Sequence, residues 1–385
     1  MLKNNISDFS KCSNCGACYN ICPVQAISVA TDDLFYQVKV DAEKCIECGL
    51  CKKVCPVNTP QKKQNLFNAY AAVNCDAEVV KKSSSGGAFS AVADLCLAQG
   101  GVVYGAAYSD DCRIVEMKST SEVALSELRR SKYVESKVGN SFRQVKENLE
   151  QQKMVLYCGA PCQIAGLKRY LGKEYDNLIT CDFSCGGMAS QHFYKEYIDY
   201  IEGKLHSPVI DVNFRSKKYG WQRLSIFIKA KNKKKYCCLS QCDPYFCCFM
   251  NKHISVREYC YDCAFTNNHY SDLILADYWK CNESKVINND SGISLILSNS
   301  PKGENIMRQL GKEMSITVLD LERASYNLYE RKSNPEFMEK RKLFLEECRK
   351  NGFINVTEKL QYPSKLKFLV KYYLKKILLC LAIGR

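Results

Sequence analysis

Apolar residues follow two different spacings in turn along residues 69–312. Short, mainly apolar runs predict buried strands over residues 69–73, 102–107, 154–158, 178–183, 209–214, 224–229, 273–276 and 293–297. Apolar residues grouped on one face predict helices over residues 87–97, 121–128, 140–151, 162–170, 191–202 and 304–312. The strands at 209–214 and 224–229 are expected to be antiparallel. Because the chain beyond residue 320 is charged with a helical pattern, the whole predicts an α+β or mixed α/β fold followed by a helical extension.

Cysteines, rather than apolar residues, set the pattern of the first 60 positions. The motif CxxCxxCxxxCP occurs twice, from Cys12 to Pro23 and from Cys45 to Pro56. Three thiolates at CxxCxxC spacing bind one 4Fe-4S cluster, and the cysteine before the proline binds the other cluster. The repeat therefore predicts two clusters with crossed ligand sets, one of Cys12, Cys15, Cys18 and Cys55 and the other of Cys45, Cys48, Cys51 and Cys22.

This segment resembles bacterial two-cluster ferredoxins over roughly residues 8–60. A hairpin of residues 26–30 and 36–41 is expected between the two motifs, and Gly16 and Gly49 would let the backbone approach each cluster. Zinc knuckles pair two CxxC units around one ion, which leaves no role for the third cysteine or the proline. The polar, proline-containing residues 57–67 are expected to form the linker to the rest of the chain.

Composition limits the cellular setting and the classes of partner. The 385 residues allow two or three domains and include 25 cysteines. Nothing at the N-terminus is typical of a signal peptide, so reduced thiols and a cytoplasmic location are expected. The formal net charge is +14, but the lysines form no nucleic-acid-binding module, so no nucleic-acid partner is predicted. The lysine-rich residues 231–235 are expected to be a solvated turn between strands.

The C-terminal tail holds the densest group of basic residues, at positions 365, 367, 371, 375 and 376, interspersed with apolar residues. These charges interrupt the tail too often for a membrane-spanning helix. A basic amphipathic helix can instead lie on the inner face of an anionic membrane, which would be a peripheral contact. A terminal helix that packs on the protein itself or on a partner is the alternative.

A series of motifs in fixed order identifies the central part of the chain. A serine- and glycine-rich stretch at residues 83–90 opens a predicted helix, where free amides attract anions. It is followed by motifs at residues 100–107, 128–136, 159–167, 214–221, 260–263 and 271–279. Over roughly residues 68–300 the chain resembles the coenzyme F420 hydrogenase/dehydrogenase beta-subunit family.

The resemblance implies FAD and electron transfer between iron–sulfur clusters and a small-molecule hydride carrier or reducible substrate, such as coenzyme F420. It also implies that Ser85, Gly86 and Gly87 bind the diphosphate of FAD. Near the flavin it implies Lys132, Tyr133 and Gln163, with the lysine stabilising the reduced ring.

Four further cysteines form a candidate third metal site: Cys162, Cys185, Cys260 and Cys263. They lie in three separate motifs, each at the expected end of a strand or helix, and four thiolates match the needs of a 4Fe-4S cluster. A zinc site, a redox disulfide and buried thiols remain alternatives, and the neighbouring Cys158 and Cys181 could replace a ligand. The cysteines at 237, 238, 242, 247 and 248 lack CxxC spacing and are expected to be structural.

No catalytic residue is assigned. The chain departs from the family at Gly186, where a histidine is expected, and at Lys280, where glycine is usual. Asp277 and Trp279 are either substrate contacts or turn residues. The four histidines, at positions 192, 206, 253 and 269, lie in no motif with a partner base, so no histidine-based acid–base mechanism is predicted.

These patterns predict a two-cluster ferredoxin domain (1–62), two parts of one beta-subunit-like unit (68–152 and 153–320) and a helical extension with the basic tail (321–385). The hypothesis is an iron–sulfur flavoprotein oxidoreductase that exchanges electrons with a redox partner protein or ferredoxin. Two alternatives stay open: a flavin-dependent reductase of surface-polysaccharide biosynthesis, and a non-catalytic electron-transfer subunit of a larger complex.

Overall fold

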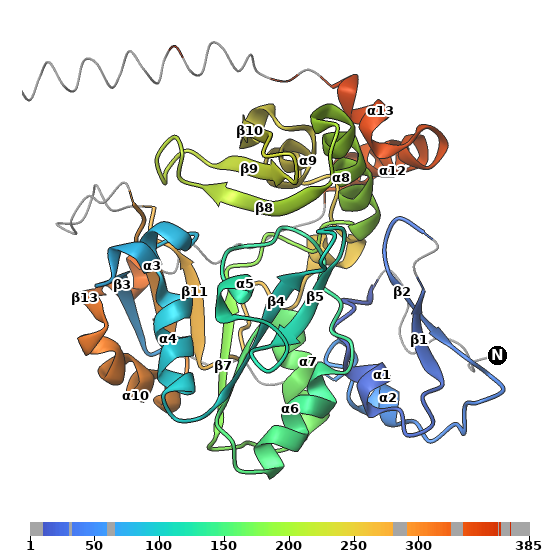
Figure 1. Ribbon diagram of the computed structural model, residues 1–385. Helices are drawn as coiled ribbons and strands as arrows, with labels where there is room; N and C mark the ends of the chain where they lie inside the picture. The colour runs from blue at the N-terminus through green and yellow to red at the C-terminus, as the bar shows by residue number, and fades with distance from the viewer. Residues whose placement is uncertain are drawn as a thin grey trace, which may run out of the picture.

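The computed structural model describes residues 11–30, 33–59, 66–279, 291–324 and 334–360, with Tyr362 and Val370 as single residues. Three expected features fall largely or wholly outside these residues: the middle of the linker, Lys280 and the basic tail. The described part is a mixed α/β structure built on one large sheet, which confirms the expected fold class (Figure 1). None of its helices combines the length and the apolar character needed to cross a membrane.

The large sheet has eight strands in the order β13-β3-β12-β11-β7-β6-β4-β5. Strands β4, β6, β7 and β11 run parallel to their neighbours in this series, whereas β5, β12, β3 and β13 add antiparallel pairs. The central strands are apolar because helices cover both faces. The strands are β3 (Asn68–Asn74), β4 (Val102–Tyr108), β5 (Val115–Ser119), β6 (Val155–Cys158), β7 (Leu178–Phe183), β11 (Leu273–Asp277), β12 (Ser294–Ser298) and β13 (Met314–Leu319).

Alternate residues of β4 and β6 face two separate cores. On one face, Val103 and Leu156 pack with α4 (Ala88–Leu97) and α10 (Pro301–Gln309). On the other face, Tyr104 and Tyr157 pack with α6 (Ser141–Glu150) and α7 (Pro161–Leu171). The short helices α3 (Ala77–Lys82) and α11 (Leu321–Ala324) contact β3. The two-residue period of a strand therefore supplies both layers.

A second, three-stranded sheet stands over the carboxyl ends of the parallel strands (Figure 1). It consists of β8 (Val209–Ser216), β9 (Ser225–Ala230) and β10 (Lys235–Leu239), all antiparallel, as expected for the first two. It packs with α8 (Gln191–Leu205), α9 (Pro244–Phe246), α12 (Pro335–Asn351) and α13 (Phe353–Glu358). The rings of Phe193 and Phe353 stack with centroids 4.5 Å apart, which joins α13 to this layer.

Several elements differ from expectation, including α3, where no helix was predicted. Strands β5, β10 and β13 were not predicted; β13 lies at the sheet edge and was missed although Met314, Ile316 and Val318 alternate with polar residues. The helix expected over residues 121–128 is only α5 (Leu125–Leu128). The Glu122 carboxylate accepts hydrogen bonds from the amide and hydroxyl of Ser119, at 2.8 and 2.9 Å, and this holds the preceding residues as a turn.

The N-terminal unit repeats its backbone geometry as its sequence predicts. It contains α1 (Ala17–Ile21), α2 (Leu50–Lys53) and the expected hairpin of β1 (Ile27–Ala30) and β2 (Gln37–Val40). Gly16 and Gly49 precede the two helices with φ of 92° and 72°, which L residues rarely adopt. The guanidinium of Arg143 donates to the carbonyls of Asn20 and Cys22, at 2.7 and 3.1 Å, and so fastens α1 to α6.

Candidate metal and cofactor site

The thiols of the N-terminal repeat lie in two groups. The proximal group is Cys12, Cys15, Cys18 and Cys55, and the distal group is Cys22, Cys45, Cys48 and Cys51. Burial raises the pKa of Cys15 to about 12, and the nearby thiols of Cys55 and Cys12 add to that shift. Burial also raises the pKa of Cys51, with Cys48 and Cys22 as its thiol neighbours. The crossed neighbours match the crossed ligand sets that the spacing predicts.

The two groups differ in their exposure to solvent. Cys15 and Cys55 of the proximal group are buried, whereas Cys48 of the distal group is exposed. Ile46, beside Cys48, is 61% exposed. Backbone amides donate to sulfur in both groups, from Asn14 to Cys12 at 3.4 Å and from Ala26 to Cys22 at 3.3 Å. Such bonds stabilise a charged thiolate.

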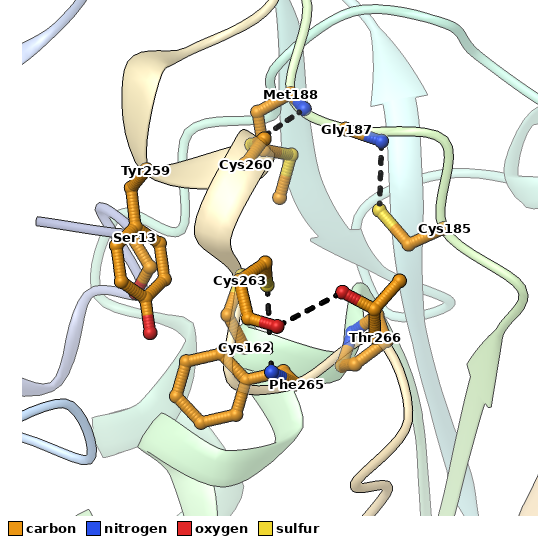
Figure 2. A pocket seen from close by; sticks show the side chains of 11 residues that line it. Ser13, Cys162, Cys185, Gly187, Met188, Tyr259, Cys260, Cys263, Phe265 and Thr266 are labelled. Atoms are coloured by element: carbon orange, nitrogen blue, oxygen red, sulfur yellow. Dashed lines mark hydrogen bonds between the residues drawn. The ribbon is translucent and has the colours of Figure 1, made fainter. Parts of the chain in front are cut away.

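The third cysteine site brings together Cys162, Cys185, Cys260 and Cys263, which line one pocket (Figure 2). Cys162 lies in the first turn of α7, Cys185 follows β7, and the other two lie at the 3₁₀ helix Glu258–Asp262. Burial raises the pKa of Cys162, and the thiols of Cys263, Cys185 and Cys260 are among its electrostatic neighbours. Three separate segments therefore supply the four thiols, as the sequence predicts.

Backbone amides also donate to the sulfurs of this site. Gly187 donates to Cys185 at 3.4 Å, Met188 to Cys260 at 3.3 Å and Phe265 to Cys263 at 3.4 Å (Figure 2). Among the described residues, no three histidine, cysteine, aspartate or glutamate side chains are arranged to hold a single metal ion. A 4Fe-4S cluster needs a wider arrangement, because each thiolate binds a different iron atom.

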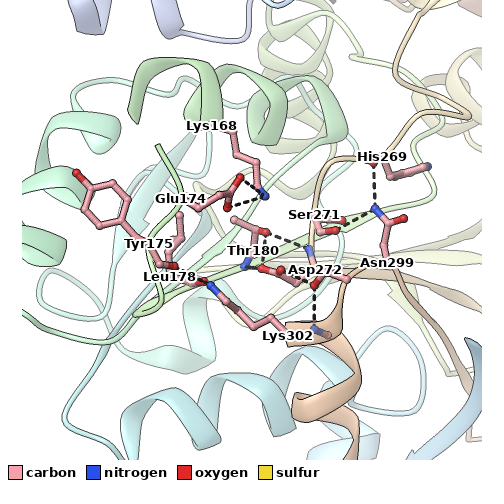
Figure 3. Close-up of polar contacts among 12 residues, drawn as sticks. Lys168, Glu174, Tyr175, Leu178, Thr180, His269, Ser271, Asp272, Asn299 and Lys302 are labelled. Carbon is pink, nitrogen blue, oxygen red and sulfur yellow. Dashed lines mark hydrogen bonds and ion pairs between the residues drawn. The ribbon is translucent and has the colours of Figure 1, made fainter. Parts of the chain in front are cut away.

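Hydrogen bonds fix the segment that leads from this site back into the large sheet (Figure 3). The Asp272 carboxylate accepts bonds from the amide and hydroxyl of Thr180, at 2.9 and 2.7 Å, and from Ser300 at 2.7 Å. Lys302 donates to the carbonyls of Tyr175 and Leu178, at 2.7 and 2.8 Å. These contacts hold β11 and α10 against β7, the strand that leads to Cys185.

The proximal group and the third cysteine site are direct neighbours. Ser13, between the first two cysteines of the chain, lines the same pocket as Cys162. Cys15 packs so closely on α7 that a Cβ at Gly166 would lie 3.0 Å from its sulfur. Cys162 is one helical turn before Gly166, and Cys15 is among its electrostatic neighbours. Only a glycine at position 166 permits this approach without strain.

A larger cavity of about 360 Å³ lies at the carboxyl ends of the parallel strands, on the other side of the Cys185 loop. Its volume is within the range of small-molecule sites. Five of the six residues expected at the cofactor line it: Ser85, Gly87, Lys132, Tyr133 and Gln163. Cys185, Gly187 and Met188 line both this cavity and the pocket of the third cysteine site.

The serine- and glycine-rich loop is fixed from several sides. Ser85 donates to the carbonyl of Ile293 at 2.8 Å, and Lys217 donates to the Ser85 carbonyl at 2.9 Å. Gly86 packs on β3, because a Cβ there would lie 2.4 Å from the carbonyl oxygen of Ala72. Gly87, with φ of 89°, begins α4 and faces the cavity. The amides at the start of this ten-residue helix can receive an anion.

Lys132, Tyr133 and Gln163 are held in place by contacts of their own. Burial, with the Arg130 charge, lowers the pKa of Lys132 to about 7. Its ammonium group nevertheless donates to three backbone carbonyls, at 2.8, 2.9 and 3.4 Å, and only the protonated form satisfies all three. Tyr133 accepts a bond from Arg215 at 3.1 Å, and Gln163 donates to Ser136 at 3.0 Å.

Arg215 and Asp277 form an ion pair at the cavity wall. The guanidinium donates to both carboxylate oxygens, at 2.7 and 3.0 Å, and its side chain is 5% exposed. Trp221 donates to the same carboxylate at 3.3 Å and stacks on Trp279 with centroids 4.6 Å apart. Asp277 is therefore more than a turn residue. The sequence contains both partners, but their separation of 62 positions hides the pairing.

Comparisons with known proteins agree with this geometry. Residues 152–324 match the model for the C terminus of the coenzyme F420 hydrogenase/dehydrogenase beta subunit, and residues 11–59 match the 4Fe-4S dicluster domain. The chain therefore joins a 4Fe-4S dicluster domain to a domain of the coenzyme F420 hydrogenase/dehydrogenase beta-subunit family. Its chemistry is that of an iron–sulfur electron-transfer oxidoreductase.

A comparison with solved structures finds several similar chains. One of them is a chain from the F420-reducing NiFe hydrogenase complex of Methanosarcina barkeri, solved as a xenon derivative. The alignment covers 75% of this chain and 94% of that one, with 14% identity and a TM-score of 0.46. At these values the cofactors and partners of that complex do not transfer to this chain. The comparison with curated proteins finds no match.

One buried acid–base pair of the family domain was not anticipated from the sequence. The Nδ1 of His269 lies 2.8 Å from the carboxylate of Asp182, and its Nε2 lies 3.1 Å from the carbonyl of Thr266. Burial opposes the charge of both groups, but Asp182 outweighs burial and raises the pKa of His269. Because Asp182 and His269 are 87 positions apart, no local sequence motif contains both residues of the pair.

The remaining thiols of the family domain have separate places. Cys158 lines the large cavity, and burial with the nearby Asp182 raises its pKa to about 12. Cys181, a residue of β7, is fully buried on one face of the large sheet. Of the cysteines expected to be structural, Cys238, Cys247 and Cys248 are buried.

Proposed function

We propose that the chain is an FAD-dependent iron–sulfur oxidoreductase with three 4Fe-4S clusters. In this proposal the distal group and the proximal group of thiolates hold the two clusters of the dicluster domain. The third cysteine site holds the third cluster, and the large cavity binds FAD. Bound FAD would supply the exchange between one-electron and two-electron chemistry that links clusters to a hydride-carrying substrate.

The observation that carries the proposal is the loop shared by the third cysteine site and the cavity. Because Cys185, Gly187 and Met188 line both, a cofactor in the cavity would lie directly beside a cluster held by Cys185. On the opposite side, Cys15 packs against α7 one turn from Cys162. The sites therefore follow one another from the exposed Cys48 to the cavity.

The residues around the cavity suit FAD. The start of α4 and the Ser85–Gly87 loop provide backbone amides that can bind the diphosphate. Because Gly86 has no side chain, this loop can pack closely on β3. Lys132 lies at the wall, and its protonated form would favour an anionic reduced ring. The predicted parts 68–152 and 153–320 share the eight-stranded sheet and the cavity, which supports treating them as one catalytic unit.

The substrate in this proposal is a small hydride carrier such as coenzyme F420, or another reducible molecule. A redox partner protein or ferredoxin would meet the chain at the distal group, where Cys48 and Ile46 are exposed. The cytoplasmic location and the membrane contact of the tail stay predictions.

Anaerobic purification followed by assays of iron, acid-labile sulfide and flavin tests this function. Three clusters require about twelve irons and about twelve sulfides per chain, with one FAD. A preparation with about eight irons would remove the third cluster from the proposal. A fully reconstituted protein that binds no flavin would contradict the enzymatic assignment, while leaving electron transfer by the dicluster domain in place.

A further inference from the structure

A buried ion pair connects the proximal group to the third cysteine site. The amide of Asn14 donates to the sulfur of Cys12 at 3.4 Å, and its side chain donates to the Glu135 carboxylate at 2.8 Å. Arg257 donates to the same carboxylate, at 2.9 and 3.2 Å. The loop between the first two cysteines of the chain is thus tied to Arg257 through one glutamate.

The backbone of Arg257 continues this connection to the third cysteine site. Its amide donates to the carbonyl of Met188 at 2.8 Å, and the Met188 amide donates to the sulfur of Cys260 at 3.3 Å. The amide of Cys260 in turn donates to the Arg257 carbonyl at 3.0 Å. A continuous series of covalent and hydrogen bonds therefore runs from the sulfur of Cys12 to the sulfur of Cys260.

The pair is isolated from solvent. The side chains of Arg257 and Glu135 are 1% and 2% exposed. The guanidinium also donates to the carbonyl of Tyr36 at 2.6 Å. After Glu135, its strongest electrostatic neighbours are Cys12 and Cys260, one from each cysteine site. Arginine stays protonated even when buried, so this is a permanent positive charge.

A fixed charge in this position acts on the oxidation state of both sites. Reduction adds one electron to a cluster and makes it more negative, so a nearby cation favours the reduced form and raises the reduction potential. The effect is strong because burial reduces screening. The Glu135 carboxylate opposes it, since its charge repels the added electron. The net effect depends on how the two charges of the pair balance.

We propose that the Glu135–Arg257 pair is a positioning element that sets the reduction potentials of the proximal and third clusters relative to the distal cluster. This inference rests on the proposed function, because it assigns clusters to both sites. The pair also holds the two sites at a fixed separation. By shifting both potentials in the same direction, it sets the energy of the electron step between the distal cluster and these two sites.

Glu135→Gln separates this role from a merely structural one. The amide retains the size of the side chain and an oxygen that accepts a bond from Arg257, but its negative charge is lost. The positive charge of Arg257 is then uncompensated, so the potentials of the proximal and third clusters rise. Arg257→Met removes the positive charge that acts on Cys12 and Cys260, and Glu135, whose pKa burial already raises, takes up a proton rather than remain an unpaired buried carboxylate, so both potentials fall. Opposite signs are the signature of a charge effect, because a general loosening of the structure would move both variants the same way.

Anaerobic redox titration of the full-length protein, followed by electron paramagnetic resonance, measures the three potentials. The distal cluster serves as the internal control and is expected to stay unchanged. Glu116→Gln is the matched control variant, since it removes the same charge from a side chain that is 38% exposed. Equal shifts of all three clusters, shifts of the same sign in both variants, or no shift in either would overturn the inference.

The iron content of the unaltered protein separates this inference from the proposed function. A protein with about eight irons lacks the third cluster, yet the proximal cluster still reports on the pair. If one variant assembles no clusters, the other variant must still change the reduction potential of the proximal cluster relative to that of the distal cluster, in the direction stated for it. An unchanged difference between those two clusters would count against the pair.

Discussion

Gly166→Ala tests whether the dicluster domain is seated on α7 as closely as the structure shows. The added methyl group would lie 3.0 Å from the sulfur of Cys15, 3.1 Å from its Cβ and 3.2 Å from its carbonyl oxygen. These contacts are all shorter than the 3.4 Å at which ordinary packing begins. Either α7 or the Cys15 loop must therefore move by a few tenths of an ångström.

Two opposing terms give the size of the effect. Alanine is favoured over glycine inside a helix by about 1 kcal/mol. Overpacking a close contact costs about 1–3 kcal/mol, so the net change is a loss of about 0–2 kcal/mol. Gly203→Ala provides the matched control, because Gly203 is exposed in α8 and no atom lies within 4 Å of its added Cβ. That variant is expected to gain about 0.5–1 kcal/mol.

Thermal unfolding under anaerobic conditions compares the two variants. For a chain of 385 residues that unfolds as one unit, 1 kcal/mol shifts Tm by about 1 °C. Gly203→Ala should melt slightly above the wild type and Gly166→Ala at or below it. Magnetic coupling between the reduced proximal and third clusters gives a second readout, which Gly166→Ala should weaken. If Gly166→Ala is as stabilising as Gly203→Ala and leaves the coupling unchanged, Cys15 does not pack on α7.

Three further variants test the sites individually. Cys185→Ala should lose up to about four of about twelve irons per chain while keeping bound flavin; an unchanged iron content would exclude Cys185 as a ligand. Gly86→Ala places a Cβ 2.4 Å from the Ala72 carbonyl oxygen, so flavin content and Tm should both fall, whereas full flavin content would show that the loop does not bind it. The folded-state pKa of Lys132 lies near 7 against 10.5 for an ordinary lysine, so between these pH values the unfolded chain binds the extra proton and stability rises with pH. The free energy of unfolding of the wild type should therefore rise against that of Lys132→Met across this window, and a constant difference would mean that the three carbonyls keep the ammonium charged.

The features that local spacing controls could be predicted without the structure. Strand β7 has the expected bounds. The repeated cysteine motif predicts three features of the dicluster domain. These are the hairpin of β1 and β2, the left-handed backbone conformation of Gly16 and Gly49, and the crossed thiol neighbours. In each case the residues that interact are close in sequence or related by the repeat.

Edge elements and turns were harder to predict. Strand β13 was missed although Met314, Ile316 and Val318 alternate with polar residues, because so short a run is a weak signal. The short helix α5 depends on the hydrogen bonds that Glu122 accepts from Ser119, which no apolar pattern reports. Propensity is a weak guide wherever few residues are buried.

The amino-acid sequence by itself determined the chemistry that the chain carries: two CxxCxxCxxxCP motifs, four further cysteines in three motifs and a glycine-rich helix start. Only the tertiary structure decided which of these meet. It placed Cys185 between the third cysteine site and the cavity, and paired Arg257 with Glu135 across 122 positions. Such pairings depend on the order of strands in the sheet and on the packing of Cys15 against Gly166. Neither can be predicted from the spacing of residues within one segment.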